Sequence, residues 1–205
     1  MIEKDTYRTI ETPTKAVLFK DKNSKFYGFA FPIENETDAK QHIETLKREH
    51  HAARHWCYAY QLGTETIYFR ANDDGEPNNS AGTPIYGQIQ SFDVTNILIV
   101  VVRYFGGVKL GVSGLINAYK TTAQLTLEAS KIVEKTIAVE FRITFDYKNM
   151  NKVMRIIKEH NITISQQKLE LDCTIYISVR KKDAGTIFNI FDTLYEITIT
   201  EIENQ

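Results

Sequence analysis

The sequence predicts an α+β protein built from two modest domains. Its 205 residues exceed one typical domain but fall short of two large ones, and 42% hydrophobic content is ordinary for a packed globular chain. The second half alternates strand and helix periodicity in a regular order. The first half ends in a continuous apolar strand, a glycine-rich loop and an amphipathic helix. We place the boundary after Lys135, which gives domains 1–135 and 136–205.

The second domain has the clearer pattern. Hydrophobic residues occupy every second position from Val139 to Tyr147, which is typical of a strand with one buried face. The spacing then predicts a helix from Met150 to about Asn161, strands 162–169 and 171–179, a helix around 184–191 and a strand at 197–201. This β-α-β-β-α-β order is that of a ferredoxin-like fold, in which two helices back four antiparallel strands.

The first domain is less regular. We expect extended segments around 15–19 and 25–33, followed by a helix that starts near Asn35 or Thr37 and buries Ala39, Ile43 and Leu46. A hairpin of 55–62 with 66–71 comes next, and then a short helix with Thr83 as N-cap and Pro84 at its first position. The domain ends with a strand at 96–104 and a helix at 113–129, whose inward side holds Leu115, Ala118, Thr122, Leu125 and Ala129. The strand at 96–104 is apolar throughout, which indicates burial on both faces.

Charge and composition exclude several classes of protein. The net charge is −1, with 16 basic and 16 acidic residues up to Lys135, and 9 and 10 after it. Neither half is a polycation, so any nucleic-acid role must rest on a local patch. The longest apolar run, Ile97 to Val102, is too short to span a bilayer, and the first residues lack a signal peptide. Cys57 and Cys173 form no metal or disulfide pattern. We expect a cytoplasmic protein without a cofactor and without membrane association.

A glycine loop follows the buried strand. It combines four glycines, Gly106, Gly107, Gly111 and Gly114, with Arg103 and Lys109 at its edges, and a helix comes next. Strand, glycine loop and helix is an arrangement that presents free backbone N–H groups to an anion. The spacing matches neither a Walker loop nor GxGxxG. The alternative is that the glycines only allow tight turns and close packing.

An acidic loop precedes this strand. Asp73, Asp74 and Glu76 place three carboxylates within four residues, and such clusters can hold a hard cation such as Mg²⁺ that bridges to a phosphate. The alternative is that these side chains cap turns through hydrogen bonds to the backbone.

A histidine and a cysteine form a third candidate. His55 and Cys57 alternate on one predicted strand and so point the same way, which allows a Cys-His nucleophilic pair. The alternative is that Cys57 is a small core residue, and no third orienting group is evident.

Three segments together carry a resemblance to a known family. They are Ala53–Tyr60 (ARHWCYAY), Asp73–Pro77 (DDGEP) with Ser80–Pro84, and Val101–Gly111 (VVRYFGGVKLG). In order and spacing they resemble the YigZ/IMPACT family over essentially the whole chain. The resemblance implies a first domain like the second domain of ribosomal protein S5. It also implies a ferredoxin-like second domain similar to the last domain of elongation factor G, and a link to translation, since the eukaryotic relatives are linked to translational control.

The function we expect is that of a translation-associated regulatory or binding protein rather than an enzyme, which docks RNA, the ribosome or a translation factor through these loops. The expected ligand-binding residues are Asp73, Asp74, Glu76, Arg103, Gly106, Gly107, Lys109 and Gly111. The alternative is a metal-assisted enzyme acting on a phosphorylated or acyl substrate. Its candidates are the carboxylates of Asp73, Asp74 and Glu76 as metal ligands, and His55, Cys57 and Asp74 as catalytic groups.

Overall fold

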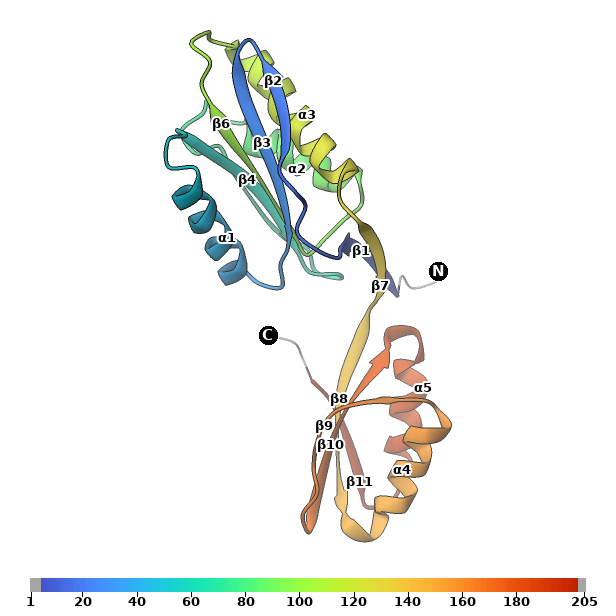
Figure 1. Cartoon of the computed structure of the whole chain (residues 1–205). Helices are drawn as coiled ribbons and strands as arrows, with labels where there is room; N and C mark the ends of the chain where they lie inside the picture. The colour runs from blue at the N-terminus through green and yellow to red at the C-terminus, as the bar shows by residue number, and fades with distance from the viewer. Residues whose placement is uncertain (1–4, 203–205) are drawn as a thin grey trace. The chain divides into compact units, whose positions relative to one another are not determined.

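The computed structural model describes residues 5–202, which form two compact units (Figure 1). One unit comprises residues 7–135. The other comprises residues 136–202 together with Asp5 and Thr6. Asp5 is joined to the second unit by two hydrogen bonds, because its carbonyl accepts the Ile137 amide at 2.8 Å and its carboxylate accepts Arg180 Nε at 2.6 Å. No helix in residues 5–202 is long and apolar enough to cross a membrane.

A five-stranded antiparallel sheet forms the middle of the first unit. Its strands, in spatial order, are β2 (Val17–Asp21), β3 (Ser24–Pro32), β6 (Ile97–Tyr104), β4 (His55–Leu62) and β5 (Tyr68–Asn72). The apolar strand β6 is the central one, hydrogen-bonded to β3 on one side and β4 on the other. Every residue of β6 except the last is buried, as its sequence predicts.

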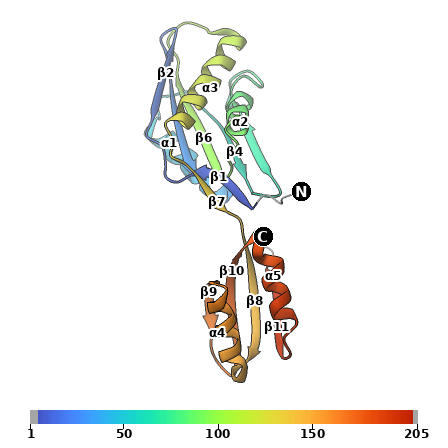
Figure 2. The ribbon, with the colours of Figure 1, turned by 90° about the vertical axis from the view of Figure 1, so that its right-hand side faces the viewer.

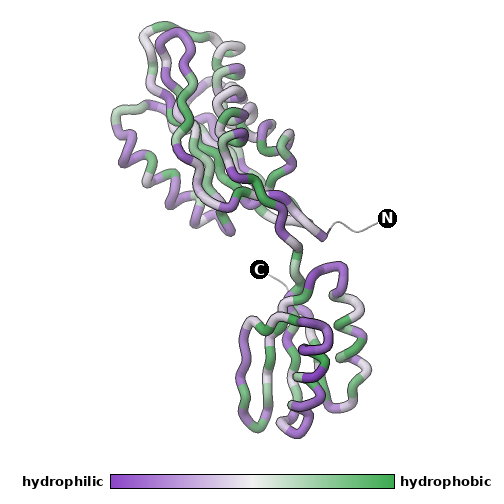
Figure 3. Tube along the Cα trace, turned by 45° about the vertical axis from the view of Figure 1, so that its right-hand side comes forward, coloured by the Kyte–Doolittle hydropathy of each residue, from purple (hydrophilic) through white to green (hydrophobic). Residues whose placement is uncertain are grey.

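Helix α1 (Glu36–Glu49) covers one face of this sheet (Figures 1 and 2). The Asn35 side chain caps it by accepting the Asp38 amide at 3.0 Å. Ala39, Ile43 and Leu46 are its buried residues, which confirms the predicted stripe. The rest of the helix is polar, and Figure 3 shows it purple along much of its length.

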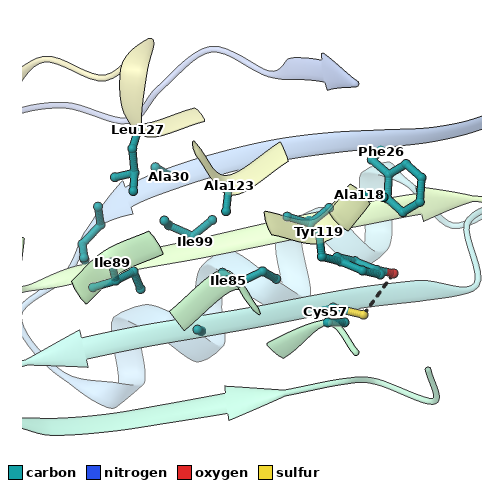
Figure 4. Packing of buried hydrophobic residues seen from close by; sticks show 14 of the residues in the cluster. Phe26, Ala30, Cys57, Ile85, Ile89, Ile99, Ala118, Tyr119, Ala123 and Leu127 are labelled. Atoms are coloured by element: carbon teal, nitrogen blue, oxygen red, sulfur yellow. Dashed lines mark hydrogen bonds between the residues drawn. The ribbon is translucent and has the colours of Figure 1, made fainter. Parts of the chain in front are cut away.

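Helices α2 (Gly82–Ser91) and α3 (Gly111–Glu128) cover the opposite face (Figure 2). Figure 4 shows the core beneath them, where Tyr119 of α3 meets Phe26 of β3 edge to face at 5.2 Å. The predicted inward residues Leu115, Ala118 and Thr122 are buried. The prediction was wrong for the helix end, because Leu125 is only half-buried and Ala129 is an exposed C-cap.

The start of α2 differs from the prediction. Its N-cap is Ala81, without a side-chain hydrogen bond, and Thr83 and Pro84 lie inside the helix. The cap is remote in sequence, because the Asp73 carboxylate accepts the amides of Ala81 and Gly82 at 2.9 and 2.8 Å. A local capping residue is therefore not needed.

A two-stranded sheet of β1 (Thr6–Ile10) and β7 (Ile132–Thr136) was not predicted. The two sequences, TYRTI and IVEKT, do not alternate strictly between apolar and polar residues, so they lack the signature of a half-buried strand. Ile10 is nevertheless fully buried in the core beneath α2 and α3.

The second unit has the predicted β-α-β-β-α-β order. Its elements are β8 (Ala138–Asp146), a 3-10 turn (Tyr147–Asn149), α4 (Met150–Glu159), β9 (Thr163–Lys168), β10 (Asp172–Arg180), α5 (Lys181–Asp192) and β11 (Ile197–Ile202). The strands lie antiparallel in the order β11-β8-β10-β9, so the first and third strands of the unit are central. This is the split β-α-β arrangement. The finer likenesses, to ribosomal protein S5 and to elongation factor G, stay predictions.

Two glycines of α2 provide a test of how tightly the loop before it is packed. A Cβ at Gly82 would lie 2.5 Å from the Asn72 amide nitrogen, whereas a Cβ at Gly87 meets nothing within 4 Å. We expect Gly82→Ala to lower the free energy of unfolding by about 1–3 kcal/mol through the steric conflict. Gly87→Ala, the matched control, should raise it by up to about 1 kcal/mol through helix propensity.

Urea unfolding followed by the fluorescence of Trp56, the only tryptophan, measures both changes in the first unit. If Gly82→Ala is as stable as Gly87→Ala, the close approach of α2 to Asn72 is wrong.

Candidate functional site

The acidic loop, residues 73–77, is ordered by its own carboxylates. Both oxygens of Asp73 accept backbone amides: Oδ2 that of Asn79 at 2.8 Å, and Oδ1 those of Ala81 and Gly82. Asp74 Oδ2 accepts the Trp56 amide of β4 at 2.7 Å. Asp74 and Gly75 adopt the left-handed conformation, with φ of 42° and 86°. The loop therefore has a defined shape before any ligand binds.

Glu76 lies at the centre of a buried polar cluster. Its Oε1 accepts hydrogen bonds from Arg103 Nη1 at 2.5 Å and from the Tyr119 hydroxyl at 2.8 Å. The side chains of Glu76 and Arg103 are only 4% and 6% exposed. The Arg103 guanidinium also lies 5.5 and 5.7 Å from the ring centroids of Phe26 and Phe105. This pair links the acidic loop to the end of the central strand β6.

Tyr119 and Cys57 continue the cluster into the core. Cys57 Sγ lies 3.3 Å from the Tyr119 hydroxyl oxygen (Figure 4) and 3.0 Å from the Asp73 carbonyl oxygen, so its S–H can donate to either. Burial raises the pKa of Tyr119, and the nearby Cys57 and Glu76 raise it further. Both groups are therefore neutral hydrogen-bonding members of the core at physiological pH.

The hypothesis of a His55–Cys57 nucleophilic pair has no geometric support. Burial raises the pKa of the Cys57 thiol, with the carboxylates of Glu76 and Asp74 adding to the effect. A thiol in this state lacks the thiolate needed for attack. His55 Nδ1 donates to the Asp74 carbonyl at 2.9 Å, and no hydrogen bond joins it to Cys57 within residues 5–202. Cys57 is a core residue.

The three carboxylates also do not converge on one point. Asp73 binds the start of α2, Asp74 binds β4, and Glu76 binds Arg103 and Tyr119. In the described part of the chain no group of three histidine, cysteine or acidic side chains could hold a metal ion. The geometry thus follows the second interpretation of the acidic loop, in which its carboxylates order turns and a helix start.

The glycine loop, residues 105–111, is shaped by close backbone approach. Gly106 donates its amide to Ser24 Oγ at 3.1 Å, and a Cβ there would collide with the backbone of Asn23. Gly107 and Gly111 have φ of 85° and 75°, which other residues rarely adopt. The loop can therefore turn directly into α3.

A pocket of about 350 Å³ lies between the two loops. The acidic loop contributes Glu76 and Pro77, and the remaining lining residues are Arg103, Phe105, Lys109, Leu110, Gly111, Val112 and Leu115. The structure thus brings together Glu76, Arg103, Lys109 and Gly111 of the predicted set. It places Asp73, Asp74, Gly106 and Gly107 outside the lining, as supports.

The N-terminus of α3 lies at this pocket and has backbone N–H groups that could bind an anion. Leu110 is its N-cap and makes no side-chain hydrogen bond, and the first turn holds no acidic residue. The first N–H groups of a helix have no partner inside the helix, so they are available to a ligand. Lys109 has no ion-pair partner among residues 5–202.

Sequence reasoning missed several residues of this site. Phe105, Val112 and Pro77 line the pocket, and Tyr119 completes the buried cluster. Phe105 lies inside the glycine motif, and Val112 follows it directly, so proximity to the motif was the available signal. Tyr119 lies eight residues beyond the glycine motif, but its contact with Glu76, 43 residues away, had no local signal.

Comparison with known proteins identifies the family of this chain. The model of the Impact N-terminal domain matches residues 22–127, a range that holds both loops and the pocket. An IMPACT family member of Haemophilus influenzae is 32% identical over 83% of this chain and 84% of that protein. The chain belongs to the IMPACT family.

Other relatives and a solved structure agree. The IMPACT family member YvyE of Bacillus subtilis is 31% identical, covering 78% of this chain and 74% of that protein. YigZ of Escherichia coli is 32% identical, covering 67% and 68%. A crystal structure described as a hypothetical protein, 24% identical, matches with a TM-score of 0.75 over 99% of this chain and all of that one. This last likeness concerns the fold.

The buried ion pair gives a stability prediction. Glu76→Gln keeps the shape of the side chain but leaves the Arg103 charge buried without a counter-charge. We expect a loss of roughly 3 kcal/mol in the free energy of unfolding, measured by urea with Trp56 fluorescence. Adding Arg103→Met removes the unpaired charge, so the double variant should be more stable than Glu76→Gln alone. A double variant less stable than the single one would contradict the pairing.

The state of Cys57 gives a reactivity prediction. At pH 8.5, near the ordinary pKa of a thiol, the folded protein should react with a thiol reagent at Cys57 at least about a hundredfold more slowly than the urea-unfolded chain. The pKa of the Cys57 thiol is raised, so little thiolate forms, and the side chain is fully buried, so the reagent cannot reach the sulfur atom. Peptide mass spectrometry after timed labelling locates the modified residue. Equal rates in the folded and unfolded chain would restore the nucleophile hypothesis.

Proposed function

We propose that this chain is a translation-associated regulatory protein that docks RNA, the ribosome or a translation factor through the acidic and glycine loops. Membership of the IMPACT family supports the link to translation, since the eukaryotic members are linked to translational control. The pocket between the two loops carries the proposal, because both motifs of the family meet there.

The chemistry of the pocket supports binding rather than reaction. Its polar side chains are Glu76, Arg103 and Lys109, and the first two neutralise each other in a buried pair. No nucleophile, base and orienting group stand together in the lining. What the pocket offers a partner is a free lysine, the amides at the start of α3 and an apolar wall.

The roles of the two cations differ. Arg103 is 5% exposed and holds the acidic loop through Glu76, so its charge acts on a ligand from behind the pocket wall. Lys109 stands on the loop itself and can reach a ligand directly. Lys109 is therefore the better residue for a binding test, because replacing Arg103 would also strand the buried Glu76.

A pull-down from cell lysate at low salt tests the proposal, with and without RNase. We expect ribosomal components, RNA or a translation factor to be retained by the parent chain and reduced about tenfold or more by Lys109→Glu, since the charge reversal repels an anionic partner. Loss of the captured components with RNase identifies RNA as the direct partner.

Lys40→Glu is the matched control. Lys40 is exposed on α1, which covers the other face of the sheet, and the variant has the same net charge. Equal capture by Lys109→Glu and Lys40→Glu, or capture of no translation component by the parent chain, would refute the proposal.

A further inference from the structure

We propose that the pocket binds the C-terminal residue of a partner protein, with the terminal carboxylate at the start of α3 and an aliphatic last side chain against the apolar wall. This inference deepens the proposed function and rests on it for the location of the site. It selects a protein rather than RNA as the direct occupant.

One side of the pocket is built for a single anion. The first-turn amides of α3, from Gly111 to Ser113, have no side-chain cap and no acidic neighbour in that turn. Backbone N–H groups at a helix start are a known mode of capturing a chain-terminal carboxylate. Lys109 precedes them directly in the sequence and also lines the pocket.

Arg103 gives an independent indication that a ligand belongs here. It lines the pocket, its side chain is 6% exposed, and its Nε–H is buried without an acceptor among the described residues. A buried donor without a partner is uncommon in a folded protein. A carboxylate in the pocket would place negative charge near this guanidinium, whose charge acts on the ligand from behind the pocket wall.

The other side of the pocket is apolar. Five of the nine lining residues are hydrophobic or proline: Pro77, Phe105, Leu110, Val112 and Leu115. None of the nine carries an amide or hydroxyl side chain, although recognition of an unstacked base uses such groups on the base edges and stacking on aromatic rings. Phe105 is the one aromatic ring. The wall therefore suits an aliphatic side chain better than a nucleobase.

The charge of the site also matches a carboxylate. Two cations and one carboxylate line the pocket, and the helix adds roughly half a positive charge. The surplus is one to two charges, enough for one anionic group. An RNA backbone carries one charge per nucleotide and is bound by larger basic surfaces, whereas residues 1–135 hold 16 basic and 16 acidic side chains.

The exposed surface beside the pocket fits a protein partner. Phe105, Val108 and Val112 are 52%, 47% and 53% exposed, and they stand together on the glycine loop and the first turn of α3. Clustered apolar side chains at the mouth of a pocket are typical of protein interaction sites. The residue before the last one in a bound chain would cover this rim.

An NMR titration of the full-length ¹⁵N-labelled chain tests the inference. The probe is the peptide N-acetyl-Ala-Ala-Leu with a free carboxylate, compared with the same peptide ending in an amide. We expect the free acid to shift the amide signals of Gly111, Val112 and Ser113. The amide form should bind at least about tenfold more weakly, since it loses a charge-assisted contact with these donors.

Val112→Asp is the variant that should abolish binding. It removes part of the apolar wall and places a competing carboxylate at the helix start, and Val112 is exposed enough for the fold to tolerate the change. Asn117→Asp is the matched control, because it adds the same charge at an exposed position of α3 outside the pocket lining. We expect at least a tenfold loss for Val112→Asp and less than a twofold change for Asn117→Asp.

Three results would overturn the inference. They are equal binding of the acid and amide peptides, no shift of the α3 amides at the solubility limit of the acid peptide, and shifts of these amides by hexauridine RNA but not by the peptide. The last result would leave the proposed function intact with RNA as the occupant. Peptide binding together with an empty lysate pull-down would instead keep the pocket chemistry and remove the link to translation.

Discussion

The buried contact between Glu76 and Arg103 determines the architecture of the site. The acidic loop lies against the end of the central strand β6 because Glu76 is held there by two hydrogen bonds. One is a charge-assisted bond of 2.5 Å from Arg103, and the other comes from the Tyr119 hydroxyl. Burying two charges is favourable only when geometry and further hydrogen bonds compensate their lost hydration. Tyr119 and the rings beside Arg103 provide that compensation, so three distant segments are fixed together.

This constraint assigns the polar residues of the two motifs mostly to structure. Asp73 caps α2, Asp74 binds β4, and Glu76 neutralises Arg103. Each of these carboxylates accepts at least one hydrogen bond from a protein donor, and the three bind different parts of the first unit. The groups that remain available are backbone amides at α3, Lys109 and an apolar wall. These groups are the basis of the proposed binding function.

Local periodicity predicted the elements well, because burial on one face leaves a repeating pattern. The β-α-β-β-α-β order of the second unit, the stripe of α1 and the central strand β6 all follow from it. Periodicity could not predict the burial of Arg103 or the capping of α2 by Asp73. Glu76 lies 27 residues before Arg103, and the amides that Asp73 accepts lie 8 and 9 residues after it, so no repeating pattern indicates these contacts. The loops could be located from composition, but their individual contacts could not.

The loops of the site are held in shape by contacts within the protein. Glycines with positive φ and the remote cap of Asp73 fix the loops in the free protein, so a ligand need not order them. A ligand of the proposed kind, one carboxylate with one aliphatic side chain, would therefore cost these loops little conformational entropy. It follows that Glu76 and Arg103 should affect stability and binding together, whereas Lys109 and Val112, both on the exposed side of the pocket, should affect binding alone.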